Sequence, residues 1–232
     1  MAWNGGRTVD IVWCCAGYSR PSLFVEDDPA HIRRQMEVNY YGSAILAHEI
    51  LKEWLAPDAP VEKDARHLIF TSSTLAFYTI AGYGSYSPTK IVLRSLADSL
   101  AQEVLLYPQN VEVHCVFPGG IESEGLKREM ETKPKVTQIL EEDDPIQHPD
   151  EVASRSIRAL EKGHHLITVS WLGHLMRWGA VGGSHKNNFV TDVLMGFVVV
   201  IAWIIAQPVL LYKVRKFAKE NGHPGKDGRK ST

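Results

Sequence analysis

Ser73, Tyr86 and Lys90 are three side chains that together can move a proton to or from a carbonyl oxygen. Because Tyr86 and Lys90 stand at positions i and i+4, a helix through them places both side chains on one face. An ammonium beside a phenol stabilises the phenolate and lowers the pKa of the phenol from about 10. Ser73 ends a short apolar run, and its hydroxyl can hold a substrate oxygen against the tyrosine. The spacing of Tyr86 and Lys90 alone also fits an ordinary helical pair, but the serine favours carbonyl–alcohol chemistry.

The elements that must position these residues follow from the hydrophobic pattern. Apolar runs of strand length occupy residues 9–14, 67–73, 111–117 and 165–170. Helical spacing of apolar residues occupies residues 29–55, 84–107 and 150–162. Asp28 and Pro29 suit the cap and the first turn of the first of these helices. Strands that alternate with long helices predict an α/β fold, a Rossmann-like doubly wound parallel sheet.

Composition bounds the class of protein. The 232 residues suffice for one domain, with 44% hydrophobic and 22% charged residues. The formal net charge of -2 gives no reason to expect a nucleic-acid partner. The three cysteines predict buried free thiols, and no residue cluster has metal-ligand spacing, so we predict no metal site. Residues 1–7 are polar, and we expect no signal peptide.

Residues 9–170 resemble the short-chain dehydrogenase/reductase family. The resemblance implies a catalytic tetrad of Asn39, Ser73, Tyr86 and Lys90, in which Asn39 supports a proton-relay water. Cys14-Cys15-Ala16-Gly17 and the run from Pro118 to Ser123 match two further family motifs. The resemblance implies a nicotinamide dinucleotide as the cofactor. The resemblance implies that it is held by Ala16, Gly17, Asn39, Tyr86, Lys90, Pro118, Gly119, Ile121 and Ser123.

One departure from the family is large. The family's domain opens with a strand and a glycine-rich turn that binds the cofactor pyrophosphate at a helix start. This sequence has no such turn, and residue 9 matches the start of the family's fourth strand. The residues that select between the two nicotinamide cofactors would also lie in the missing part. We therefore expect residues 1–182 to be a partial domain with an unpaired edge strand at 9–14, and the chain alone to be poorly folded and inactive.

Residues 122–148 are charged and contain Pro134 and Pro145. In the family this position holds the variable substrate loop, so we expect a lid that closes over a lipid chain. A solvated surface insertion is the alternative. The apolar side chains expected to contact the lipid are Leu126, Met130, Val136, Ile139 and Leu140.

Residues 193–212 carry no charge and, as a helix, reach about 30 Å, the thickness of a bilayer's hydrocarbon core. We predict a membrane segment, preceded by a linker at 183–192 and followed by a basic tail at 213–232. The catalytic domain is expected in the cytosol, but the basic tail also favours the cytosol. Either the tail crosses the membrane, or Pro208 and the run 166–181 allow a hairpin or an interfacial arrangement.

The motifs at 118–125 and 183–188, followed by a membrane segment, resemble a subfamily, the fungal 3-ketodihydrosphingosine reductases. This resemblance implies NADPH-dependent reduction of the 3-keto group of a long-chain sphingoid base at the endoplasmic reticulum membrane. Another membrane-bound reductase of a steroid or 3-ketoacyl ketone stays open, as does a non-catalytic membrane-anchored protein. A homo-oligomer through the helices 29–55 and 84–107 is also left open.

Overall fold

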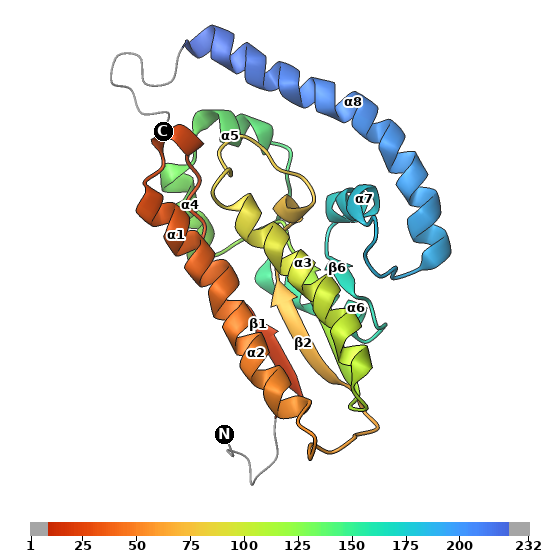
Figure 1. The fold of residues 1–232 in the computed structure, drawn as a ribbon. Helices are drawn as coiled ribbons and strands as arrows, with labels where there is room; N and C mark the ends of the chain where they lie inside the picture. Colours follow the sequence, from red (N-terminus) through yellow and green to blue (C-terminus); the bar gives the residue numbers. More distant parts are fainter. Residues whose placement is uncertain (1–8, 223–232) are drawn as a thin grey trace.

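A four-stranded parallel sheet forms the centre of the protein, as the sequence predicts (Figure 1). The structure, a computed structural model, describes residues 9–222. The predicted lack of a signal peptide at 1–7 and the last part of the basic tail, 223–232, lie outside these residues. The strands run in the order β1-β2-β3-β6, with bounds Ile11–Cys14, Arg66–Thr71, Val111–Phe117 and Leu166–Thr168. Among the described residues, β1 pairs only with β2, and Ile11 is 61% exposed at this edge.

Two long helices, α2 (Gly42–Trp54) and α3 (Ser87–Glu103), cover one face of the sheet (Figure 1). Side chains alternate along a strand, so one set of strand residues meets these helices. Leu68 and Phe70 of β2 pack there with Trp54 of α2 and Leu93 of α3, all of them buried. Cys14 and Cys115 are also buried, whereas Cys15 is exposed, so the prediction of three buried thiols is wrong for Cys15.

The opposite face of the sheet packs against α6 (Pro149–Leu160). Ile69, Val116 and Ile167 contact Val152 in a smaller buried cluster. After β6 the chain enters α7 (Trp171–Ala180), which starts with a side-chain cap from Ser170. The run 166–181, considered above as a membrane-interfacial segment, thus supplies a sheet strand and a helix packed on the core.

The predicted helix 29–55 is interrupted by a π-helical turn. It consists of α1 (Pro29–Met36), the turn Glu37–Tyr41, and α2. The side chain of Asp28 accepts a hydrogen bond from the backbone of Ala30, which confirms the predicted cap. A π-helical turn inside an α-helix often occurs at a functional site, and this one contains Asn39.

Residues 122–148 are more regular than their composition indicates. They form α4 (Glu124–Thr132) and α5 (Lys135–Leu140), and a two-stranded sheet of β4 (Gly120–Ile121) and β5 (Ile146–Gln147) closes the segment. Of the apolar residues expected to line a lid, Val136 is buried, whereas Met130 and Ile139 are exposed.

The last helix, α8 (Phe189–Asn221), extends beyond the predicted membrane segment at both ends. It lies across one end of the domain, beside α7 and α5 (Figure 1). Among residues 9–222 it is the one helix long and apolar enough to cross a membrane, and only 6% of its most apolar stretch is buried. Pro208 lies inside it without ending it.

Candidate active site

Ser73, Tyr86 and Lys90 meet at the carboxyl end of β2. Ser73 follows this strand, and Tyr86 precedes the first residue of α3. The ammonium of Lys90 donates to the carbonyl of Thr71 at 3.0 Å and lies 5.8 Å from the centre of the Tyr86 ring. Tyr86 also shares a hydrogen bond with Ser73. The three side chains that the sequence singles out therefore lie together.

Asn39 joins this group from the π-helical turn. It is fully buried, and its amide donates to Thr89 Oγ1 and to the carbonyl of Tyr18, both at 2.8 Å. Its Oδ1 accepts from the backbone of Tyr18 at 2.7 Å. Asn39 thus ties the loop after Gly17 to the helix that carries Lys90. Its role in holding a relay water stays a prediction.

The electrostatics of Tyr86 differ from the expectation. Burial raises the pKa of Tyr86, and the nearby Glu129 carboxylate raises it further, although the hydrogen bond from Ser73 acts in the opposite direction. Burial also lowers the pKa of Lys90 to about 8. The sequence predicted that Lys90 would lower the pKa of Tyr86. In the structure the pKa of Tyr86 is raised instead, by loss of hydration and by neighbouring carboxylates, and Lys90 is not among the causes of the shift.

The loops that would face a cofactor lie against these catalytic residues. A Cβ atom added to Gly17 would lie 3.4 Å from Lys90 Nζ and 3.5 Å from Asn39 Oδ1, so a side chain there would fill the space in front of Lys90. Ala16 is exposed beside it. The carbonyl of Pro118 accepts from the backbone of Thr74, and a Cβ at Gly119 would meet open space.

The last two cofactor candidates lie where the substrate segment begins. Ile121 belongs to the short strand β4. Ser123 caps α4, since its hydroxyl accepts from the backbone of Leu126 and donates to the carbonyl of Ile121, both at 3.2 Å. The hydroxyl of Ser123 is therefore engaged in starting this helix, and its contact with a cofactor stays a prediction.

A charged cluster that the sequence did not reveal holds the segment 122–148 beside Tyr86. Tyr83 donates to Glu129 at 2.6 Å and to Glu141 at 3.2 Å, and Lys133 bonds to both carboxylates. The rings of Tyr83 and Tyr86 are 5.7 Å apart. A solvated insertion would lack such partly buried ion pairs, so the geometry favours a packed wall of the site.

The packing of the segment 122–148 against the active-site loop requires a glycine at position 82. Gly82 has a φ of 99°, and a Cβ there would lie 1.9 Å from Thr137 Oγ1, which donates to the carbonyl of Ala81. Only glycine allows this backbone conformation and this close approach at little cost. Its signal in the sequence is weak, because the contact joins residues far apart.

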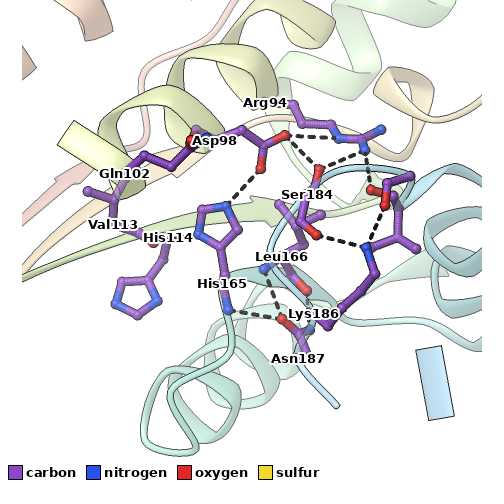
Figure 2. Close-up of polar contacts among 12 residues, drawn as sticks. Arg94, Asp98, Gln102, Val113, His114, His165, Leu166, Ser184, Lys186 and Asn187 are labelled. Atoms are coloured by element: carbon purple, nitrogen blue, oxygen red, sulfur yellow. Dashed lines mark hydrogen bonds and ion pairs between the residues drawn. The ribbon is translucent and has the colours of Figure 1, made fainter. Parts of the chain in front are cut away.

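A second polar network fixes the far end of α3 to the chain that leads to α8 (Figure 2). Asp98 accepts from Ser184 at 2.6 Å and from His165 Nε2 at 2.9 Å. Arg94 donates to the Ser184 hydroxyl at 2.9 Å, and Asn187 bonds to the backbone of β6 at Leu166. Helix α3, which begins directly after Tyr86, is thereby held to the start of the apolar C-terminal helix.

Comparison with known sequences agrees with this geometry. The model of the family described as short chain dehydrogenase matches residues 3–134. The 3-ketodihydrosphingosine reductase gsl-3 of Neurospora crassa is 50% identical over 97% of this chain and 63% of its own length. The 3-ketodihydrosphingosine reductase ksrA of Aspergillus fumigatus is 43% identical over 96% of this chain and 65% of its own length. The chain thus spans less than two thirds of either reductase.

Solved structures share the fold. A short-chain dehydrogenase from Sphingobium yanoikuyae in complex with NADPH has a TM-score of 0.61 and 18% identity, over 75% of this chain and 62% of its own. A short chain dehydrogenase from Burkholderia cenocepacia in complex with NADP has a TM-score of 0.60 and 21% identity, over 75% of this chain and 66% of its own.

Proposed function

The chain belongs to the short-chain dehydrogenase family, and we propose that it reduces the 3-keto group of a long-chain sphingoid base with NADPH. The observation that carries the reaction type is the meeting of Ser73, Tyr86 and Lys90 at one end of β2. The 50% identity to a reductase named for 3-ketodihydrosphingosine supports the substrate.

Tyr86 is the proton donor of the proposed reduction. Its pKa is raised, so it is protonated at neutral pH, and ketone reduction needs an acid that gives a proton to the oxygen. Ser73 orients the carbonyl by donating its hydroxyl hydrogen to the same oxygen. Lys90, still largely charged below a pH of about 8, stabilises the phenolate that remains after proton transfer.

The residues present fit the nicotinamide end of the cofactor. The space in front of Lys90 that a side chain at Gly17 would fill suits a ribose, whose hydroxyls would accept from the ammonium. NADPH, when bound, supplies the hydride that reaches the ketone carbon. The open space beside Gly119 leaves room for the nicotinamide. The two related structures bound to NADP and NADPH support the phosphorylated cofactor.

The exposed apolar surface of α8 supports a membrane location. Its side chains from Phe197 to Val209 are largely exposed, and a lipid bilayer would cover them. Helix α8 also contacts the active-site loop, since the ring centroids of Tyr78 and Trp203 are 4.9 Å apart and the rings are tilted by 36°. A lipid substrate with one polar end could then reach the site from the membrane. We place the protein on the endoplasmic reticulum membrane with the catalytic domain in the cytosol.

The test measures NADPH oxidation with a panel of ketones. It uses the 232-residue chain and, beside it, an extended protein in which this chain is joined to the residues of the Neurospora crassa reductase outside the matched segment. We expect the extended protein to oxidise NADPH with 3-ketodihydrosphingosine at least about tenfold faster than with a steroid ketone or a 3-ketoacyl thioester. A faster steroid or 3-ketoacyl reaction would instead assign another lipid ketone. An extended protein that binds NADPH but reduces none of these ketones would contradict the proposal.

A further inference from the structure

We propose that His67, Glu112 and His114 bind a divalent transition-metal ion such as Zn²⁺. Their ligand atoms, one from each side chain, all lie within 4.8 Å of one another. Two imidazoles and one carboxylate are a ligand set that zinc commonly takes in proteins. From the sequence we predicted no metal site, because His67 and His114 lie on different strands and lack the spacing of metal ligands along the chain.

The sheet register explains why the three side chains meet. In the β2–β3 pair, His67 stands opposite Glu112, and Ile69 stands opposite His114. Alternate residues of a strand point to the same face, so all three side chains leave the face that carries Ile69 and Val116. The site therefore rests on two paired strands and not on a loop, which gives its ligands a fixed spacing.

The spacing of the ligand atoms fits a metal ion. His67 Nδ1 is 3.0 Å from His114 Nε2, and Glu112 Oε2 is 3.5 Å from His114 Nε2 and 3.8 Å from His67 Nδ1. Zinc–nitrogen and zinc–oxygen bonds of about 2.0–2.2 Å in a tetrahedron place neighbouring ligand atoms about 3.3 Å apart. The three atoms thus approximate one face of such a tetrahedron and leave a fourth position for water.

The hydrogen bonding of His114 leaves a lone pair inside the cluster. His114 Nδ1 lies 2.8 Å from the backbone carbonyl of His164, which can only accept, so this nitrogen carries the ring proton. In the neutral ring, Nε2 is then an acceptor aimed at His67 and Glu112. A carbonyl bonded to the other ring nitrogen is the usual way in which a ligating histidine is oriented.

The three side chains offer more hydrogen-bond acceptor atoms to one another than they have protons to donate within the cluster. Without an ion, one proton on His67 Nδ1 can satisfy His114 Nε2, and the Glu112 carboxylate then faces that nitrogen with no proton between them. A divalent cation satisfies all three atoms at once. His67 is 28% and Glu112 46% exposed, so an ion can enter, whereas His114 is buried at 2%.

The site lies far along the strands from the catalytic residues. His67 and Glu112 are near the amino ends of β2 and β3, whereas Ser73 follows the carboxyl end of β2. The ion would join two neighbouring strands and stabilise the sheet without contacting the reacting ketone.

The test is a zinc titration of the full chain in detergent, and of the extended protein, both without a histidine tag. We expect about one tightly bound Zn²⁺ per chain, a melting temperature raised by about 5 °C at saturation, and a visible absorption band when Co²⁺ replaces zinc. His67→Gln and Glu112→Gln should each weaken binding at least about tenfold. His48→Gln, which changes an exposed histidine that also neighbours a glutamate, should bind zinc as the unaltered protein does.

Circular dichroism of each variant without zinc separates lost binding from lost folding, and Glu112→Gln changes a half-exposed side chain that the fold tolerates. Turnover should be the same for His67→Gln and the unaltered protein, so the metal site and the reductase activity can fail separately. Zinc binding that is absent, or that His67→Gln and Glu112→Gln leave unchanged in folded protein, would overturn the proposal.

Discussion

Replacing Tyr86 by phenylalanine removes one hydroxyl and leaves the ring in place. Tyr86 is the acid of the proposed reaction, and its raised pKa means that the hydroxyl is protonated at neutral pH. General acid catalysis contributes about 10²–10⁴-fold to a rate, or about 3–5 kcal/mol of transition-state stabilisation. We expect Tyr86→Phe to lower the kcat of the extended protein within this range. NADPH affinity, measured by fluorescence titration, should change less than about threefold, because Lys90 keeps its bond to Thr71.

Tyr83→Phe is the matched control for this change. Its ring lies 5.7 Å from that of Tyr86, but its hydroxyl bonds to Glu129 and Glu141 and not to Ser73. Loss of these bonds should lower the free energy of unfolding by about 1–3 kcal/mol, with kcat kept within about tenfold. Tyr86→Phe with near-normal turnover, or Tyr83→Phe as slow as Tyr86→Phe, would refute the assignment of the acid.

Three further predictions concern pH, membrane binding and stability. Turnover should fall as pH rises past about 8, because burial lowers the pKa of Lys90 to about 8 and its ammonium is lost above that value. The variant Lys90→Arg stays charged, so its turnover should not fall in this range. A flat pH profile to pH 9.5 in the unaltered protein would contradict the role of Lys90. Ending the chain after Gly196 removes most of the apolar part of α8 but keeps Asp192, and should release the protein from membranes in a flotation assay; continued flotation would argue against the anchor. Asp192→Asn breaks the buried ion pair with Arg177 and should lower the free energy of unfolding, measured in denaturant melts, by about 3–5 kcal/mol. Glu220→Gln breaks an exposed pair with Lys216 and should lower it by only about 0–1 kcal/mol, and equal losses would contradict the structural role of the buried pair.

The parts of the fold that the sequence predicted are those with strong local signals. The strand Val111–Phe117 has the predicted bounds, and the helix after Tyr86 follows the apolar spacing. Asp28 and Pro29 mark a helix start because capping chemistry involves neighbouring residues. The motif of Ser73, Tyr86 and Lys90 could be predicted because Ser73 follows β2 and Tyr86 and Lys90 lie at the start of α3.

The parts that the sequence could not predict depend on contacts between distant residues. The charges and prolines of residues 122–148 predicted an irregular segment, but Tyr83 and Lys133 order it through two partly buried carboxylates. The π-helical turn at Asn39 has no periodicity of its own. The pKa of Tyr86 is raised first by burial and then by Glu129, and both depend on how distant parts of the chain fold together. Helix α8 starts before residue 193 because a buried ion pair between Arg177 and Asp192 fixes its first turn.

Hydride transfer from labelled cofactor tests the central claim most directly. The extended protein is incubated with 3-ketodihydrosphingosine and NADPH that carries deuterium at both C4 positions of the nicotinamide, and the lipid product is analysed by mass spectrometry. We predict dihydrosphingosine with one deuterium on C3, formed by the unaltered protein and at least about 100-fold more slowly by Tyr86→Phe. A product without deuterium, or no reduced lipid from a protein that binds NADPH, would contradict the account.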